Sequence, residues 1–456
     1  MTAPGRLDLE ALRALVGSGE IDTVVVAITD MQGRLQGKRV TAAHFLDEVV
    51  EHSTEGCTYL LAVDVEMATV GGYAVSSWEQ GYGDFVMQPD LDTLRLVPWH
   101  PGTATCAADA IWHDGSPVAP SPRQVLRAQL ARLADHGWHA LAATELEFLV
   151  FRDSYEDAWT AGYRGLTPAN LYNVDYSILG TGRIEPLLRR IRDEMGRAAM
   201  RVESVKGECN LGQHEIAFRF DDALSKADEH ALFKTGAKEI AAQEGFSLTF
   251  MAKYDEREGN SCHVHLSLRD ADDVPVFAGD DGPGGAGTSP VFASFLAGML
   301  ATVRELTLLL APNVNSYKRF VPASFAPTAI AWGHDNRSCA FRIVGRGPSL
   351  RIETRVPGGD VNPYLALAAL LAGGLHGVEH GLELEPAFAG NAYDSDAPRL
   401  PATLDEATEL FARSAVARSA FGDDVVDHYT HMARTELSSF RAAVTDWERV
   451  RCFERM

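Results

Sequence analysis

The sequence predicts a mixed fold of helices and strands, divided near residue 118 into a smaller and a larger part. Up to Trp112 the chain consists mainly of short apolar runs separated by glycine-containing turns, a pattern typical of strands. Prolines then cluster at positions 117, 120 and 122. From Trp138 onward predicted strands alternate with predicted helices, and the C-terminal region is mostly helical. We therefore expect two domains, residues 1–117 and residues 118–456.

The first elements follow from local signals. Asp8 is placed to cap a helix that ends near Val16, because apolar residues recur there at helical spacing. Residues 23–28 form an uninterrupted apolar run rich in valine, which predicts a buried strand. Residues 31–38 contain two glycines and predict a turn.

The larger part begins with a helix whose two ends are marked in the sequence. Ser121 takes the N-cap position, Pro122 the first helical position, and Gly137 follows the end. Much further on, residues 280–287 are rich in glycine and aspartate, but no Gly-Lys-Ser/Thr sequence follows them. We expect a flexible surface loop at that point and no phosphate cradle.

Composition and charge exclude several classes of protein. Among 456 residues, 41 Lys and Arg against 63 Asp and Glu give a net charge of −22, so nucleic acid and membrane partners are not expected. The most lipid-like run, Leu365–Leu375, is about half of the ~20 residues that a membrane span needs. The N-terminus lacks an apolar signal core, and the six cysteines are spread singly. We expect a cytoplasmic protein with reduced thiols.

Four predicted strands carry charged or imidazole side chains on one face. Successive residues on one face of a strand lie roughly 6.5–7 Å apart, which allows neighbouring carboxylates to share a cation. A sheet with one solvated face is the simpler explanation for any single strand, but such faces favour Thr, Lys, Gln and Ser. The residues that share faces are Glu145 with Glu147, Glu215 with Arg219, His263 with His265 and Ser267, and Glu353 with Arg351 and Arg355.

Carboxylates on neighbouring strands repel one another unless countercharge lies among them. The five carboxylates concerned are Glu145, Glu147, Glu208, Glu215 and Glu353. Two or three divalent cations would supply the countercharge, and a set of oxygen ligands with few imidazoles suits Mg²⁺ or Mn²⁺. Zinc is disfavoured because neither Cys209 nor Cys262 has ligand spacing.

An arginine-rich stretch follows the carboxylate-bearing strands. Guanidinium groups bind carboxylate and phosphoryl oxygens through two hydrogen bonds at a time. Metal ions at one end of a site and guanidinium groups at the other are suited to transferring a phosphoryl group onto an anion. The arginines are Arg319, Arg337, Arg342, Arg351 and Arg355.

Ordered motifs along nearly the whole chain resemble the glutamine synthetase family. They include Glu-Leu-Glu-Phe at 145–148, Gly-Gln-His-Glu at 212–215, His-Val-His at 263–265, Asn-Ser-Tyr-Lys-Arg at 315–319 and Arg-Ile-Glu-Thr-Arg at 351–355. The resemblance implies an α+β protein with a small N-terminal β-grasp domain and a catalytic domain in which helices flank an antiparallel sheet. It also implies a dodecamer of two stacked hexameric rings, with each active site between neighbouring subunits.

The resemblance further assigns a role to individual residues, with ATP and glutamate as substrates. It implies that one metal is held by Glu147, Glu208 and Glu215, and the other by Glu145, His263 and Glu353. The ATP end would be bound by Glu203, His265, Ser267, Arg342 and Arg351. Gly259, Arg319 and Arg355 would hold glutamate, and Arg337 and Arg319 would act in catalysis, with Arg337 neutralising the transferred phosphoryl group.

The sequence departs from the family pattern at residues that bear on whether ammonia or an organic amine is the nitrogen donor. Phe325 stands where ammonia-using members carry a glutamate, and a phenyl ring offers no proton acceptor. It does offer an apolar or cation–π surface to an alkyl amine. Glu55 aligns with an ammonium-contacting aspartate, so we place Glu55 and Phe325 in an amine site. Glu258 replaces an asparagine beside Gly259 and can pair with an ammonium group.

We therefore expect ATP-dependent ligation of the glutamate γ-carboxylate to a primary amine through a γ-glutamyl phosphate. The amine would be a polyamine such as putrescine or spermidine, or a monoamine such as ethanolamine, in amine utilisation or detoxification. Two alternatives stay open: an ammonia-dependent glutamine synthetase, and a non-catalytic nitrogen-sensing relative. Against the first stands Phe325, and against the second stands the full set of ligands and arginines.

Overall fold

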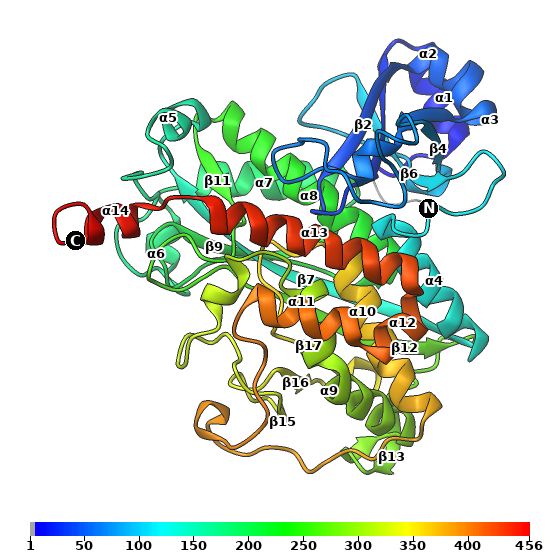
Figure 1. Ribbon diagram of the computed structural model, residues 1–456. Coiled ribbons are helices and arrows are strands. Elements are labelled where there is room, and N and C mark those ends of the chain that lie inside the picture. The colour runs from blue at the N-terminus through cyan, green and yellow to red at the C-terminus, as the bar shows by residue number, and fades with distance from the viewer. Residues whose placement is uncertain (1–4) are drawn as a thin grey trace.

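The N-terminal segment folds around its own six-stranded sheet, drawn in blue and cyan in Figure 1. The computed structural model describes residues 5–456. The strand order is β2-β1-β6-β4-β3 with β5 beside β6, and only the β1–β6 pair is parallel. The strands are β1 (Thr23–Thr29), β2 (Leu35–Thr41), β3 (Thr54–Cys57), β4 (Asp84–Pro89), β5 (Arg95–Leu96) and β6 (Thr103–Ile111), with helices α1 (Leu9–Gly17), α2 (Ala42–His44) and α3 (Val50–His52).

A nine-stranded sheet forms the centre of the larger part. Its order is β15-β16-β17-β12-β7-β9-β8, and β10 and β11 also pair with β7. Every pair in it is antiparallel except β15–β16, which confirms the expected α+β class. The strands are β7 (Trp138–Phe151), β8 (Val202–Gly207), β9 (Gln213–Phe218), β10 (Asp221–Asp222), β11 (Ser247–Thr249), β12 (Cys262–Asp270), β15 (Trp332–His334), β16 (Phe341–Val344) and β17 (Arg351–Thr354).

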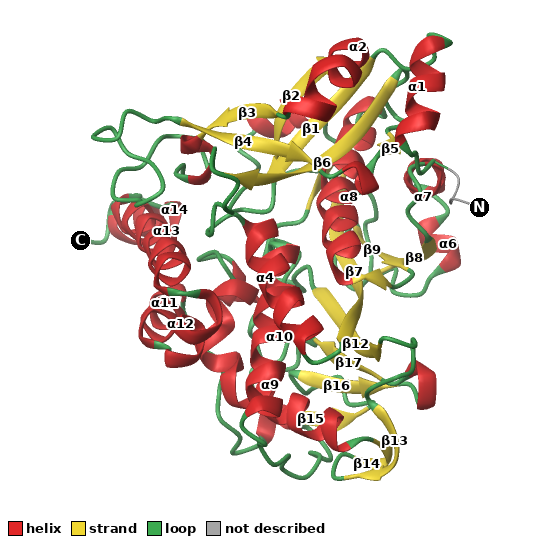
Figure 2. Cartoon of the chain, turned by 90° about the vertical axis from the view of Figure 1, so that its right-hand side faces the viewer, coloured by secondary structure: helices red, strands yellow, loops and turns green. Residues whose placement is uncertain are grey.

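Helices cover the larger sheet, and Figure 2 shows α4, α10 and α9 in one column beside the strands. The helices are α4 (Pro122–Asp135), α5 (Tyr155–Thr160), α6 (Ile178–Thr181), α7 (Glu185–Arg197), α8 (Ala223–Gln243), α9 (Pro290–Leu310), α10 (Pro363–Glu379), α11 (Leu404–Arg413), α12 (Ala415–Phe421), α13 (Asp423–Ala442) and α14 (Asp446–Cys452). A Cβ on Gly298 of α9 would lie 2.2 Å from the Gly373 carbonyl oxygen of α10, so glycine permits this close packing.

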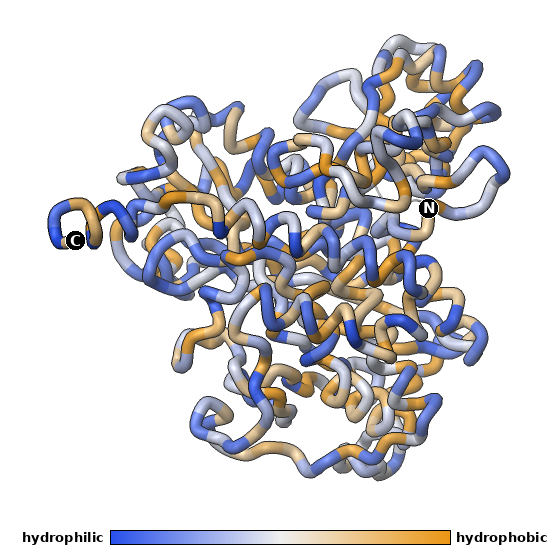
Figure 3. The backbone as a smooth tube through the Cα atoms, viewed as in Figure 1, coloured by the Kyte–Doolittle hydropathy of each residue, from blue (hydrophilic) through white to orange (hydrophobic). Residues whose placement is uncertain are grey.

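Hydrophobic residues, orange in Figure 3, run through the body of the molecule, and α9 is one of the most apolar helices. It is long and apolar enough to cross a membrane by length and composition alone. However, 72% of its apolar window is buried inside the fold, as expected of a core helix. The predicted lipid-like run Leu365–Leu375 lies in another buried helix, α10, so both apolar helices belong to the core.

Two turn predictions were wrong because glycine permits strands as well as turns. Residues 35–38, predicted to lie in a turn, belong to β2. A Cβ on Gly37 would lie 2.0 Å from the Val26 carbonyl oxygen, so this glycine lets β2 approach β1. The predicted loop at 280–287 is largely a hairpin of β13 (Ala278–Gly282) and β14 (Gly285–Thr288).

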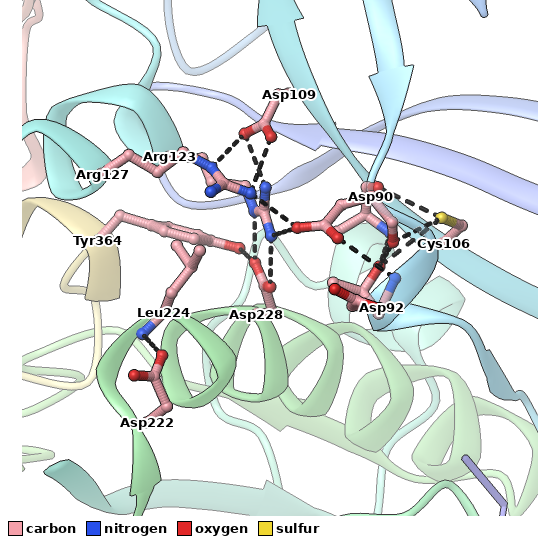
Figure 4. Close-up of polar contacts among 12 residues, drawn as sticks. Asp90, Asp92, Cys106, Asp109, Arg123, Arg127, Asp222, Leu224, Asp228 and Tyr364 are labelled. Carbon is pink, nitrogen blue, oxygen red and sulfur yellow. Dashed lines mark hydrogen bonds and ion pairs between the residues drawn. The ribbon is translucent and has the colours of Figure 1, made fainter. Parts of the chain in front are cut away.

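A buried ionic cluster around Arg123 links β6 of the smaller sheet to helices α4 and α8 (Figure 4). The Arg123 guanidinium of α4 donates hydrogen bonds to Asp228 of α8 at 2.9 and 3.0 Å. It also donates to Asp109 of β6 and to Asp90, each at 2.7 Å. Burial favours the neutral form of Asp90, but the Arg123 hydrogen bond and charge lower its pKa overall. The domain boundary at 117/118 stays a prediction, and this cluster holds together the elements on either side of it.

Candidate active site

The register of the larger sheet brings the predicted site residues of different strands into opposing pairs. Residues directly opposite in an antiparallel pair project from the same face, with Cβ atoms about 5 Å apart. The hypothesis of a shared charged face is therefore consistent with the alignment of the six strands concerned, which are β8, β9, β7, β12, β17 and β16. The opposing pairs are Lys206–Glu215, Glu215–Glu147, Glu145–His263, His265–Glu353 and Glu353–Arg342.

Two cavities meet over this face of the sheet. The larger has a volume of about 620 Å³ and the smaller about 250 Å³. Glu145, His265 and Arg351 line both, so the cavities are continuous parts of one site. The larger cavity is further lined by Glu147, Asp175, Lys206, Glu208, Glu215, Glu258, Gly259, His263, Phe325, Arg337, Arg342 and Arg355.

Two groups of side chains in the larger cavity fit divalent cations. Glu145, His263 and Glu353 offer ligand atoms within 4.8 Å of one another, and so do Glu147, Glu215 and His263. The Nε2 atom of His263 is buried and has no hydrogen-bond partner among the residues that the structure describes. An orphaned imidazole nitrogen among carboxylates is suited to a metal ion, so the residues present fit the expected cofactor.

Burial and mutual repulsion disfavour the charged form of some carboxylates in the cavity. Burial, followed by the charge of Glu208, raises the pKa of Glu147 to about 7. Burial also raises the pKa of Glu215 to about 9, although Lys206 opposes the shift. Glu353 differs: burial favours its neutral form, but His263 and Arg355 lower its pKa to about 2. The positive charge near Glu147 and Glu215 therefore compensates less of their charge than His263 and Arg355 compensate at Glu353.

Glu208 lies apart from the metal group that the resemblance implies for it. Its carboxylate pairs with the Lys206 ammonium, and it belongs to a third acidic group with Asp175 and Cys209. The Lys206 ammonium also lies 3.6 Å from Asp175 and 4.0 Å from Glu215. Sequence reasoning missed Lys206 and Asp175, although the alternation of Lys206 with Glu208 was a usable signal.

The arginines do not all lie where they were expected. Arg337 and Arg355 line the larger cavity, as a substrate-binding role requires. Arg342 was expected at the ATP end but also lines the larger cavity, where it donates to Glu353 at 2.6 Å. Arg351 donates to His265 Nδ1 at 3.2 Å between the two cavities.

Arg319 is the clearest departure from the expected site. Its side chain is buried, and its terminal nitrogens donate to the Val356 and Arg355 carbonyl oxygens at 2.8 and 2.9 Å. It is absent from the residues that line the cavity in the described chain. Arg319 thus supports the cavity wall, and a Cβ on Gly259 would lie 2.9 Å from its Cγ atom.

The smaller cavity has the composition expected of a nucleotide site. Glu203, His265, Ser267 and Arg351 line it, which are four of the five residues implied for ATP. Phe220 adds an aromatic surface there. An aromatic face and a guanidinium group are suited to a base and a phosphate, respectively.

The two predicted amine-site residues lie in different surroundings. Phe325 lines the larger cavity and is 59% exposed. Its φ of 58° is left-handed, which is strained for an aromatic residue, and Arg355 donates to its carbonyl oxygen at 3.4 Å. Glu55 lies on β3 instead, 3.9 Å from His113, and does not line this cavity within one chain.

Comparison with known proteins identifies the family. The family model "Glutamine synthetase, catalytic domain" matches residues 119–452. The chain therefore belongs to the glutamine synthetase family, whose members use ATP and divalent metal ions.

Several individual proteins are also similar to this chain. The chain is 65% identical to a gamma-glutamylethanolamide synthetase from Streptomyces coelicolor over 450 residues, covering 99% of this chain and 96% of that protein. It is 37% identical to a glutamate–isopropylamine ligase from Pseudomonas sp., covering 99% of each chain. Among solved structures it is similar to the ADP complex of GmaS, with a TM-score of 0.85 and 28% identity over 97% of this chain and 99% of that one.

Proposed function

We propose that this protein is an ATP-dependent ligase that joins the γ-carboxylate of glutamate to a primary organic amine. The observation that carries the proposal is Phe325 in the cavity that also holds the carboxylates and arginines. This cavity has the groups for activating a carboxylic acid, yet Phe325 offers no proton acceptor for ammonium. Similarity to relatives named for ethanolamide and isopropylamine products supports an organic amine, and ethanolamine is the first candidate.

The reaction proceeds in two displacement steps. A γ-carboxylate oxygen of glutamate attacks the terminal phosphorus of ATP, ADP leaves, and γ-glutamyl phosphate forms. The uncharged amine nitrogen then attacks the acyl carbon, phosphate leaves, and the nitrogen loses one proton. Arg337 and Arg355 line the cavity where negative charge develops, and guanidinium groups there stabilise it.

The protein would hold two or three divalent ions, Mg²⁺ or Mn²⁺, in this site. Glu145, His263 and Glu353 would bind one, and Glu147 and Glu215 another, while Glu208 would stay paired with Lys206. When bound, the metal supplies positive charge that screens the repulsion between ATP and the glutamate carboxylate. Glu203, His265, Ser267 and Arg351 would bind ATP in the smaller cavity, and Gly259 and Arg355 would contact glutamate in the larger.

A phosphate-release assay tests the proposal. Purified protein with Mg²⁺ or Mn²⁺, ATP and glutamate is expected to release phosphate upon addition of ethanolamine, and much less upon addition of ammonia. Mass spectrometry should find the γ-glutamyl amide in the same mixture. Strong turnover with ammonia alone would indicate an ammonia-dependent glutamine synthetase. ATP binding without turnover with any amine would indicate a non-catalytic relative.

The same proposal includes a cytoplasmic dodecamer of two hexameric rings. Glu55 does not reach the larger cavity within one chain, so an amine-site role requires it to come from a neighbouring subunit. The helix α14 projects from the body in Figure 1, and its Trp447 and the Phe453 that follows it are exposed, which supports burial in an assembly. Sedimentation of the purified protein tests the number of subunits.

A further inference from the structure

Lys206 places a fixed alkylammonium group inside the reaction cavity. Its side chain is 22% exposed, and its ammonium pairs with Glu208 and lies 3.6 Å from Asp175. The same ammonium lies 4.0 Å from Glu215 and 4.6 Å from the centre of the Tyr176 ring. Three carboxylates and an aromatic face thus surround one positive charge.

The groups around Lys206 are of the kind that binds an organic ammonium ion. Carboxylates form charge-assisted hydrogen bonds with ammonium groups, and aromatic faces attract them. In this chain the binding groups are already used, because Lys206 occupies them. Without Lys206, Asp175, Glu208 and Tyr176 would form an anionic recess in the wall of the cavity that also contains Phe325.

We propose that Lys206 determines amine specificity by restricting the substrate to amines with a single amino group. The inference rests on the proposed ligase function and names its substrate class. The distal ammonium of a diamine or polyamine meets the charge of Lys206 and finds the recess filled. A monoamine with a neutral tail, such as an amino alcohol, carries no second charge and avoids this repulsion.

The unmodified enzyme gives the first test, with substrates that differ only in distal charge. Putrescine and 4-aminobutan-1-ol have the same four-carbon chain and the same reactive amine. We expect kcat/KM to be at least about tenfold higher for the amino alcohol, because like charges in a partly desolvated site repel strongly. Equal kcat/KM values for the two substrates would overturn the proposal.

Two variants test whether Lys206 is the cause. Lys206→Met removes the charge and keeps the approximate length, and we expect it to lower the preference for 4-aminobutan-1-ol at least about tenfold. Lys206→Arg retains the charge and is the matched control, so its preference should stay near that of the unmodified enzyme. An unchanged preference in Lys206→Met, with turnover retained, would refute the assignment.

A chain-length series covers the case in which Lys206→Met loses turnover with every amine. In the unmodified enzyme, α,ω-diamines of increasing length are compared with amino alcohols of equal length. Discrimination should decrease as the distal charge moves away from Lys206, and length-independent discrimination contradicts the proposal. Failure of the proposed function is distinguishable, because then no amine of either class supports phosphate release in the unmodified enzyme.

Discussion

The protein contains two buried clusters of acidic residues that differ in how their charge is balanced. In the cluster around Arg123, Asp90, Asp109 and Asp228 each accept a hydrogen bond from the Arg123 guanidinium. In the cavity, Glu147 accepts hydrogen bonds from the Gln213 amide and a backbone N–H group, and within residues 5–456 no cationic side chain donates to it.

The difference shows how a binding site can be told from a structural one. The arginine-bound Asp90 has a lowered pKa, although burial alone would raise it. In contrast, the pKa of Glu147 rises to about 7 through burial and the charge of Glu208. A cluster that balances its own charge stabilises the fold, whereas a cluster left unbalanced is suited to an external cation.

The largest effect is expected in the cluster around Arg123. Arg123→Met leaves three carboxylates without their shared partner, so the free energy of unfolding should fall by about 3–5 kcal/mol. Denaturant unfolding followed by circular dichroism measures this change. Arg127→Met is the control: its side chain is 38% exposed and should contribute less than about 1 kcal/mol. Equal effects of the two variants would contradict the central role of Arg123.

The next effect is expected in the cavity, where a substitution should lower activity and leave stability unchanged. Glu215→Gln removes a carboxylate that faces Glu147 and lies 4.0 Å from the Lys206 ammonium. Amine-dependent phosphate release should fall by at least about 10²-fold, because the site would lose one of the proposed metal ligands. Thermal unfolding in EDTA should show no loss of stability, since repulsion is also removed. A clear loss in EDTA would show that Glu215 is structural.

A smaller effect is expected from adding metal. Mg²⁺ or Mn²⁺ at 100 times its dissociation constant should stabilise the unmodified protein by about 2.7 kcal/mol for one site. Arg127→Met should respond like the unmodified protein, and Glu215→Gln should respond less. Thermal unfolding with and without EDTA measures the shift. If the metal stabilises Glu215→Gln as much as the unmodified protein, Glu215 is not a ligand.

The smallest effect is expected at Phe325. Phe325→Glu restores a proton acceptor on the cavity wall, so the ratio of ammonia to ethanolamine turnover should rise by about tenfold. Phe325→Leu keeps the apolar character and should leave that ratio low. Phosphate release with each nitrogen donor measures the ratio. An equal rise in both variants would indicate that only the size of the side chain matters.

The sequence predicted the shared face because alternation is a local property of a strand. Glu145 and Glu147 project from the same face of any regular strand that contains both. Which strands lie side by side is decided by contacts distant in the sequence, so the position of Lys206 opposite Glu215 could not be predicted from alternation alone. The burial of Arg319 was missed for the same reason, since its carbonyl partners lie 36–38 residues away.

The long strand β7 limits which insertions and deletions this enzyme can accept. Neighbours on both sides align with β7, and Glu145 and Glu147 face them from its middle. Inserting or deleting one residue within 138–144 would shift the register and exchange the ligand face for the apolar face. New amine preferences should therefore arise by substitution on the strands, while changes in length are confined to the surrounding loops.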